Sequence, residues 1–315
     1  MDIMTIGEVL IDLTQTGINA QGIPEYTANP GGAPANLCVA ASRLGASTGF
    51  IGKVGKDAFG SLLIRTLTDD NVNTEGLIVD RAYPTTLAVV SVDEKGERDF
   101  SFYRKPGADV MLDISEISPE LLKNNKIFHF GSVSLTDEPA ASATLTAAQT
   151  AKKNGSIISY DPNYRERLWT SEAEAIEKMK APLDMVDIIK VSDEELPLLT
   201  GTSELEKGSL ILANYGIKLI VVTLGADGVF FRRGNETGSL TGIKVKVGDT
   251  NGAGDSFFGA LLSRLCKLDK PLEIGREELI SALDFANHAA ALTASRHGAI
   301  PALPTLTEVE EFMES

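Results

Sequence analysis

Short apolar runs alternate with helical stretches along most of this chain, and this alternation limits the possible folds more than any other feature. Helical patterns cover Ala33–Leu44, which stops at Gly45, and Ala58–Thr68. Such alternation is typical of a mainly parallel sheet with helices on both faces, so we expect an α/β fold. The strand-like runs lie at residues 2–10, 48–54, 127–130, 156–160, 187–190 and 219–223.

Residues 85–104 interrupt this pattern. A β-branched run, Thr85–Val92, is followed by the turn-forming Asp93–Gly96 and by the alternating segment Glu97–Arg104. This order predicts a β-hairpin and not a strand–helix–strand unit. Two interpretations stay open, a lid over a polar or anionic ligand and an ordinary edge hairpin whose arginines blunt the edge. In either case a period of two places four side chains on one face: Arg98, Phe100, Phe102 and Arg104.

The charge balance argues against two classes of partner. The 315 residues carry a net charge of −15, from 29 basic and 44 acidic side chains. Such a surface repels nucleic acid and anionic membranes, although one local site can still bind an anionic nucleotide. Cys38 and Cys266 each lie in an apolar helical pattern, which favours free thiols in a reducing compartment. With no signal-peptide pattern and no apolar stretch near ~18 residues, we expect a cytoplasmic protein.

The segment Asp249–Asp255 precedes the apolar run Ser256–Leu262 and predicts a small-residue loop that opens a helix. Unpaired N–H groups at a helix N-terminus attract anions, and the glycines permit close approach. Asp255 would repel a phosphate unless it is the base for a hydroxyl that attacks that phosphate. The simpler alternative is an acidic residue placed to complement the helix dipole.

A second small-residue motif, Gly31–Asn36, precedes the first helix. Asn36 can donate and accept hydrogen bonds at once, as sugar hydroxyls require, although the motif also fits a simple helix entry with proline in the first turn. Asp12 is expected at the end of the first strand, where ligands of α/β sheets gather. There it would bind two hydroxyls of a polyol or merely form a turn.

Other candidate residues follow later strands. Arg165 can neutralise phosphate charge in a transition state, and Glu195 can hold Mg²⁺ through water. Ser192 is also expected to cap the helix there. The glycine turn in Thr223–Gly228 either faces a nucleotide or only connects strands, and Asn287 offers a polar edge to adenine.

Several familiar motifs are missing from the sequence. There is no G-x-x-x-x-G-K-[ST] loop, and no G-x-G-x-x-G follows the first strand. These absences argue against a P-loop enzyme and against an NAD-linked dehydrogenase. The three histidines lack metal-ligand spacing, and we expect His129 to be structural.

In their order and separation, Gly31–Asn36 and Asp249–Asp255 resemble the two signatures of the ribokinase-like (pfkB) carbohydrate kinase family, over essentially the whole chain. Within that family the chain looks most like a fructokinase. The segments that carry this finer resemblance are Arg98–Arg104, Asp161–Asn163 with Arg165, Lys190–Glu195 and Gly298–Pro304.

The resemblance implies a three-layer α/β/α sandwich with a mainly parallel central sheet and a small β-lid, and often homodimers joined through the lids. The α/β domain would comprise residues 1–11, 31–84 and 106–315, and the lid residues 12–30 and 85–105.

The resemblance also implies residue roles. Asp255 would be the catalytic base, with Arg165 nearby and an anion hole formed by the amides of Gly252, Ala253 and Gly254. The sugar would contact Asp255 together with Asp12, Gly31, Gly32, Asn36, Phe102 and Arg104. ATP would contact Lys190, Thr223, Gly225, Gly228, Gly254 and Asn287. Glu195 would hold Mg²⁺, and Asp249 with the Asn251 carbonyl would hold a monovalent cation such as K⁺.

The function that follows is ATP-dependent phosphorylation of D-fructose to fructose 6-phosphate. One alternative is a kinase for 2-keto-3-deoxygluconate, whose carboxylate would suit Arg104 and Arg165, or another sugar kinase of the family. A catalytically silent sugar- or nucleotide-binding protein is disfavoured because the base and the anion-hole residues are present. Two departures stand out: Ser192 where many relatives have Asn, and Ala33-Pro34 where ribokinases often carry Lys-Gly, which argues against ribose.

Overall fold

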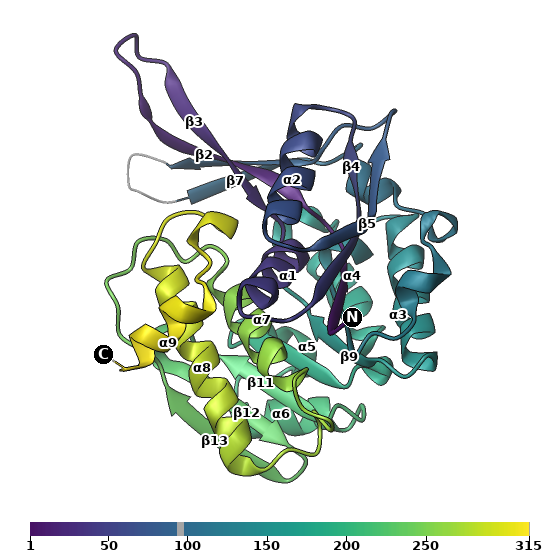
Figure 1. The fold of residues 1–315 in the computed structure, drawn as a ribbon, viewed down its shortest axis with the longest axis vertical. Helices are drawn as coiled ribbons and strands as arrows, with labels where there is room; N and C mark the ends of the chain where they lie inside the picture. The colour runs from purple at the N-terminus through teal and green to yellow at the C-terminus, as the bar shows by residue number, and fades with distance from the viewer. Residues whose placement is uncertain (93–97, 315) are drawn as a thin grey trace.

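The structure is a computed structural model that describes residues 1–92 and 98–314, and its larger sheet forms the centre of the molecule (Figure 1). In this described part the sheet has nine strands in the order β13-β12-β11-β10-β9-β8-β1-β4-β5. All neighbours are parallel except β11 with β12 and β12 with β13, which are antiparallel. The predicted mainly parallel sheet is therefore confirmed. Its strands are β1 (Ile3–Ile6), β4 (Thr48–Gly55), β5 (Asn73–Asp80), β8 (Ile127–Gly131), β9 (Ile157–Asp161), β10 (Ile188–Ser192), β11 (Leu219–Thr223), β12 (Gly228–Arg233) and β13 (Glu236–Thr241).

Helices cover both faces of this sheet, so the three-layer prediction is also confirmed (Figure 1). Successive strand residues point to opposite faces: in β10, Ile188 packs in one core with Phe257, and Ile189 packs in another with Ala147. The first core takes residues from α1 (Ala33–Arg43), α7 (Ala253–Leu265), α8 (Arg276–Ala294) and α9 (Leu306–Glu314). The second takes them from α3 (Ala140–Lys153), α4 (Glu172–Lys180), α5 (Glu195–Thr200) and α6 (Leu205–Ala213). A third, smaller core joins α1 to α2 (Ala58–Asp69).

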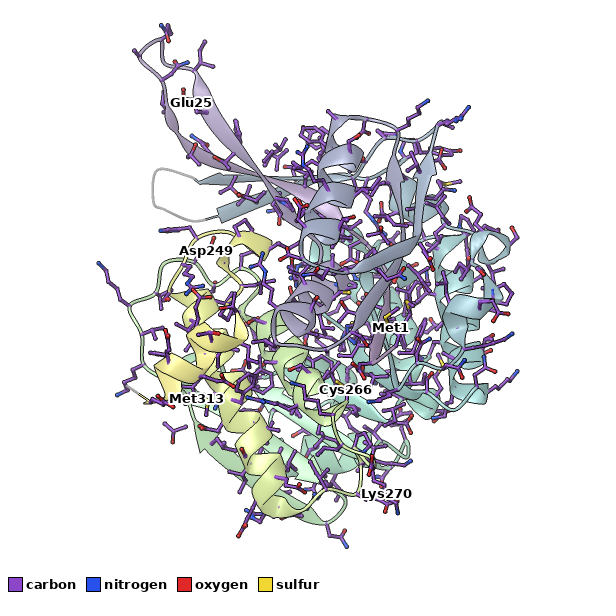
Figure 2. The ribbon with its side chains drawn as sticks, in the orientation of Figure 1. Met1, Glu25, Asp249, Cys266, Lys270 and Met313 are labelled. Atoms are coloured by element: carbon purple, nitrogen blue, oxygen red, sulfur yellow. The ribbon has the colours of Figure 1, made fainter. Side chains whose placement is uncertain are left out.

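A second, smaller sheet lies beside the first. Its order is β3-β2-β6-β7, formed by β3 (Pro24–Gly31), β2 (Leu10–Ile18), β6 (Leu87–Val92) and β7 (Arg98–Tyr103). β2 and β6 are parallel to each other, whereas the two outer pairs are antiparallel hairpins. The β2–β3 hairpin projects from the body, with Glu25 near its tip (Figure 2). This sheet matches the small sheet that the family resemblance implied.

The structure corrects the expected position of Asp12. The first strand ends at Ile6, and Asp12 lies inside β2 of the small sheet, opposite Asn29. The reason is local: Gly7 has a φ of 153°, so the chain leaves the central sheet there and begins a new strand at Leu10.

The predicted hairpin over residues 85–104 is present as β6 and β7. The expected turn at Asp93–Gly96, with Glu97, lies outside the described residues. So do the side chains of Arg98 and Phe100. Phe102 and Arg104 are described, and both reach the site discussed next.

Candidate active site

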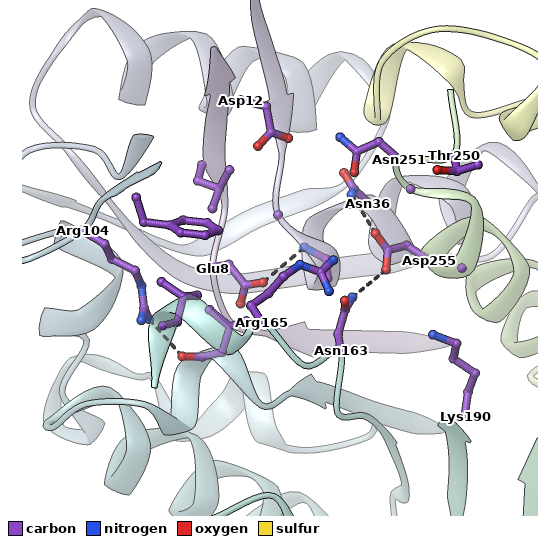
Figure 3. A pocket seen from close by; sticks show the side chains of 18 of the residues that line it. Glu8, Asp12, Asn36, Arg104, Asn163, Arg165, Lys190, Thr250, Asn251 and Asp255 are labelled. Carbon is purple, nitrogen blue, oxygen red and sulfur yellow. Dashed lines mark hydrogen bonds between the residues drawn. The ribbon is translucent and has the colours of Figure 1, made fainter. Parts of the chain in front are cut away.

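A polar cavity of about 580 Å³ lies where the small sheet, α1, the end of β10 and the start of α7 meet (Figure 3). Figure 3 shows side chains from all of these segments directed toward a common space. Most of its lining side chains are polar, and the apolar ones are Leu10, Ala33, Phe102, Val133 and Leu168. The polar members are Glu8, Asp12, Asn36, Asn163, Glu194, Thr250, Asn251 and Asp255, together with Arg104, Arg165 and Lys190.

Asp255 is the most tightly held acidic group in this cavity. It is buried in the first turn of α7. Asn36 Nδ2 donates to its Oδ2 at 2.8 Å, and Asn163 Nδ2 donates to its Oδ1 at 3.0 Å (Figure 3). Each oxygen therefore keeps a lone pair for another donor, and the carboxylate cannot rotate freely.

Burial raises the pKa of Asp255 above its ordinary value, while Asn36, Lys190 and Arg165 act in the opposite direction. A carboxylate with a raised pKa is a better proton acceptor than a free one. The geometry therefore suits Asp255 for removing a proton from a group bound in the cavity.

The N-terminus of α7 lies at the edge of the same cavity. The helix follows Gly252, whose φ of 78° is left-handed and suits glycine. The backbone N–H of Ala253 donates to the Thr250 carbonyl at 3.2 Å, so this one of the three expected anion-hole amides already has a partner. A Cβ atom on Gly254 would lie 3.2 Å from Lys190 Nζ. A side chain at position 254 would thus crowd the amine that approaches the helix N-terminus.

Lys190 and Glu195 lie in a buried ionic cluster beneath that edge. Lys190 Nζ pairs with Asp161 Oδ2 at 2.9 Å. Burial alone would lower the pKa of Lys190, but the carboxylates of Asp161, Glu195 and Asp255 raise it. Lys190 is therefore a protonated amine held close to Gly254.

Glu195 is occupied by backbone hydrogen bonds. It accepts one from the Tyr164 N–H at 2.7 Å and one from the Ser192 N–H at 2.8 Å. Ser192 Oγ in turn accepts a bond from the Glu195 N–H at 3.1 Å, as expected of a helix cap. Among the described residues, no group of three or more acidic, histidine or cysteine side chains is placed to hold a metal ion. A role for Glu195 toward Mg²⁺ stays a prediction.

Asp12 and Glu8 form the opposite wall. Burial raises the pKa of Asp12 to about 6 and that of Glu8 to about 7. Glu8 Oε1 accepts a bond from the Ala33 N–H at 3.2 Å at the start of α1, and Glu8 Oε2 has no partner among the described residues. Glu8 is a site residue that the sequence did not predict, because its only signal is an acidic residue inside the first apolar run.

Arg104 lines the cavity, but its guanidinium donates hydrogen bonds to other protein groups. Its Nε donates to Asp109 Oδ2 at 2.7 Å, its Nη1 to Thr136 Oγ1 at 2.6 Å, and its Nη2 to the Val133 carbonyl at 3.0 Å. Arg165, in contrast, is exposed at the cavity rim and donates to the Tyr164 carbonyl at 3.0 Å. Of the two arginines expected near a ligand, only Arg165 is exposed to solvent.

A second cavity of about 550 Å³, which we call the apolar cavity, adjoins the polar one. Thr250 and Gly254 line both cavities, so the two meet at the start of α7. The structure brings five of the six expected nucleotide residues into the apolar cavity: Thr223, Gly225, Gly228, Gly254 and Asn287. The sixth, Lys190, lies instead in the polar cavity. Residues of the apolar cavity that sequence reasoning missed are Gly242, Ile243, Lys244, Val245, Val247, Ala290, Ala291 and Ala294.

The remaining expected residues lie near these two cavities. Gly32, Gly252 and Gly254 line the polar cavity, and Ala253 lines the apolar one. Gly31 sits behind Asp12, where any side chain would collide with the Asp12 carboxylate. Asp249 accepts bonds from the N–H groups of Asn251 at 2.9 Å and Gly298 at 3.4 Å.

Comparison with known proteins decides the family of the chain. The family model described as pfkB family carbohydrate kinase matches residues 1–306. The chain belongs to the pfkB carbohydrate kinase family. The predicted family is thereby confirmed, and this pfkB chain is an ATP-dependent carbohydrate kinase by its family and relatives.

Three relatives illustrate how far the similarity to pfkB proteins extends. Fructokinase-1 of Oryza sativa subsp. japonica is 43% identical over 316 residues, covering 99% of this chain and 98% of the relative. The structure of a fructokinase from Xylella fastidiosa with bound ATP superposes with a TM-score of 0.92 at 32% identity, covering 99% and 98% of the two chains. A fructokinase variant from Vibrio cholerae O395 with bound fructose, ADP and potassium ion gives 0.90 at 36% identity, covering 99% and 98%.

None of the helices in residues 1–92 and 98–314 is both long enough and apolar enough for a membrane span.

Proposed function

We propose that this kinase phosphorylates D-fructose on its primary 6-hydroxyl with ATP and yields fructose 6-phosphate. The observation that carries the proposal is the position of Asp255, a buried carboxylate at the point where the polar and apolar cavities meet. The names of the relatives support fructose as the sugar: the Vibrio relative carries fructose and ADP, and the plant relative is a fructokinase.

In this proposal the sugar binds in the polar cavity. Asp12 and Asn36 accept and donate hydrogen bonds to the hydroxyls, and Phe102 covers an apolar edge of the sugar. Buried acceptors without partners support this role, because Asn36 Oδ1 and Glu8 Oε2 have none in the described structure. A polyol would supply the missing donors. Gly31 leaves the space that the Asp12 carboxylate requires, and Gly32 leaves the space that the Glu8 and Val9 backbone requires beside the cavity.

The nucleotide binds in the apolar cavity, with its triphosphate toward the start of α7. Thr223, Gly225, Gly228 and Asn287 line the base and ribose end. The helix N-terminus stabilises the charge on the transferred phosphate through the amides of Gly252 and Gly254 and through that of Ala253, which would exchange the Thr250 carbonyl for the phosphate. Lys190 and Arg165 add positive charge from the polar side.

The reaction needs one proton transfer. Asp255 accepts the proton of the 6-hydroxyl while the hydroxyl oxygen attacks the γ-phosphorus, and the bond to the β–γ bridging oxygen breaks to release ADP. Asn36 and Asn163 hold the Asp255 carboxylate in one orientation for this step. The small sheet closes over the sugar as a lid and excludes water, which would otherwise consume ATP without product.

The cofactors would be Mg²⁺ and a monovalent cation. Each oxygen of Glu195 accepts one backbone N–H and keeps a lone pair for a water molecule bound to Mg²⁺, and exposed Glu194 lines a small third cavity together with Glu195. These donors fit a hydrated Mg²⁺ bound with ATP, where the ion would neutralise phosphate charge. Asp249 and the Asn251 carbonyl would hold K⁺ beside α7, which the potassium ion in the Vibrio relative supports.

We also propose that two copies pair through their lids. Four of the exposed large apolar side chains lie on or beside the small sheet, at Ile18, Ile23, Tyr26 and Tyr103. Exposed apolar surface of this kind is typical of an interface. Sedimentation at low micromolar concentration tests the pairing, and a monomer throughout would refute it. A cytoplasmic location stays a prediction.

The test of the function is ADP production with Mg-ATP and potassium against fructose, ribose, 2-keto-3-deoxygluconate, glucose, mannose and adenosine. We expect the highest kcat/KM with fructose, with fructose 6-phosphate as the product identified by NMR. A higher kcat/KM with 2-keto-3-deoxygluconate would agree with the proposed mechanism but refute fructose as the preferred substrate. No turnover with any of them would favour a silent binding protein.

A further inference from the structure

We propose that Asp109 makes the polar cavity selective for a neutral sugar, because it neutralises Arg104 in the cavity wall. This inference rests on the proposed sugar kinase function and assigns the substrate class to one residue. Asp109 follows the lid hairpin, in the short helix Ala108–Met111, and is not a member of the sequence motifs described above.

Arg104 is buried, and several protein groups bind its guanidinium. The side chains of Arg104 and Asp109 are 3% and 2% exposed, and they form an ion pair at 2.7 Å. Each terminal nitrogen of the guanidinium donates one N–H, Nη1 to Thr136 Oγ1 and Nη2 to the Val133 carbonyl, and Asp137 Oδ2 lies 3.9 Å from Nη1. Because protein carboxylates already balance its charge, the guanidinium attracts a substrate carboxylate less than an unpaired arginine would.

The opposed charges of Arg104 and Asp109 also act on other groups in the cavity wall. Burial is the largest influence on the pKa of Glu8, but Arg104 lowers that pKa and Asp109 raises it. The positive charge of Arg104 and the negative charge of Asp109 therefore have opposite electrostatic effects on a carboxylate in the cavity wall. They would have the same opposite effects on the carboxylate of a bound sugar.

Two side chains donate hydrogen bonds to the Asp109 carboxylate. Thr86 Oγ1 donates to Asp109 Oδ1, while Arg104 donates to Oδ2. Thr86 directly precedes β6 and Arg104 directly follows β7, so one buried carboxylate joins both ends of the lid hairpin. Asp109 is thus fixed in place and cannot turn away to free Arg104 for an anionic ligand.

The remaining charges support the same selectivity. Lys190 is paired with Asp161, and the acidic groups Glu8, Asp12 and Asp255 line the cavity. In the proposed function, Arg165 at the cavity rim interacts with the transferred phosphate and not with the sugar. An acid sugar would bring a further negative charge into a wall that is already acidic, and this costs binding energy at low dielectric.

The test is the ratio of kcat/KM for 2-keto-3-deoxygluconate to that for fructose, in the wild type and in Asp109→Asn. We expect the ratio to rise about tenfold or more in the variant, because Arg104 then loses its buried counter-charge and keeps only the partly exposed Asp137 at 3.9 Å. In the double variant Arg104→Gln/Asp109→Asn the gain should disappear. An unchanged ratio in Asp109→Asn, or a gain that survives in the double variant, would overturn the proposal.

Asp70→Asn is the matched control. It breaks a half-buried Arg–Asp pair, Arg43 with Asp70 at 2.6 Å, and neither residue lines the polar cavity. This variant should lose thermal stability and leave the sugar ratio unchanged, which separates charge selectivity from general destabilisation. A change in its ratio equal to that of Asp109→Asn would count against the proposal.

A measurement on the wild type keeps the proposal testable if Asp109→Asn does not fold. D-Gluconate and D-glucitol differ at one terminal carbon, which is a carboxylate in the first and a hydroxymethyl group in the second. Gluconate should inhibit fructose phosphorylation about tenfold more weakly than glucitol. Equal or stronger inhibition by gluconate would contradict the account. Absence of fructose phosphorylation in the wild type would instead refute the proposed function.

Discussion

The polar and apolar cavities meet at the start of α7, but they are built in different ways. The polar cavity is lined by charged and amide side chains that hydrogen bonds hold in place, such as Asp255 between Asn36 and Asn163. The apolar cavity is lined mainly by glycine turns, aliphatic side chains and helix alanines. In the polar cavity, proton transfer and sugar selectivity therefore depend on particular side chains. In the apolar cavity, nucleotide binding depends on the shape of the cavity and on its backbone. Substitutions in the two cavities should have separable effects.

The largest expected effect is that of Asp255→Asn. Removing the proton acceptor should lower kcat by a factor of ~10² to ~10⁴, while the Kd for fructose changes little because the amide keeps the shape and an acceptor oxygen. Single-turnover kinetics and calorimetric titration with fructose measure the two quantities. Turnover near that of the wild type would refute the assignment of the base.

Asp12→Ala should produce the next largest change. Loss of a buried charged acceptor costs roughly 1.5–3 kcal/mol, so the KM for fructose should rise roughly 10- to 100-fold, while the KM for ATP stays the same. Steady-state kinetics with each substrate varied in turn measure both constants. An equal rise in both would mean that the two cavities are not separable.

The pH dependence should come from the polar cavity. Burial raises the pKa of Asp12 to about 6 and raises that of Asp255 above its ordinary value. Asp255 accepts the proton and Asp12 accepts hydrogen bonds from the sugar, and both need the ionised carboxylate, so kcat/KM for fructose should be full above pH 7 and fall as pH decreases through about 6, by about tenfold per pH unit for each group that protonates. The profile is measured in buffers of constant ionic strength. A flat profile down to about pH 5 would contradict these roles.

The smallest expected effect belongs to the apolar cavity. Val247 lines it and is 61% exposed without ligand. Val247→Ala removes apolar contact worth about 1 kcal/mol, so the KM for ATP should rise by a few-fold with the KM for fructose unchanged. Val79→Ala, at a comparably exposed site on β5 outside both cavities, is the matched control. A rise in the fructose KM alone would reverse the assignment of the cavities.

The two cavities also differ in how well they could be predicted from the sequence. Four residues that the sequence assigns to the sugar line one cavity: Asp12, Gly32, Asn36 and Asp255. They were predictable because their motifs combine unusual residue types at fixed spacing. The apolar cavity was only half predicted. Its glycine turn after β11 was visible, but the segment 242–247 carries no motif, since aliphatic residues there resemble any loop or core.

The fold was predictable where the apolar period was clear. The parallel strands and their covering helices follow from alternation, but β5, β12 and β13 were missed because their sequences are half polar. Partners within the site were also not predictable. That Arg104 is paired with Asp109, and that Asn163 holds Asp255, depends on distances between segments far apart in the chain.

A crystal structure with fructose and a non-hydrolysable ATP analogue tests the central claim most directly. The claim predicts the sugar in the polar cavity with its 6-hydroxyl in hydrogen-bonding contact with Asp255, and the nucleotide in the apolar cavity with its terminal phosphate at the N-terminus of α7. A sugar bound elsewhere, or a terminal phosphate directed away from α7, would contradict it.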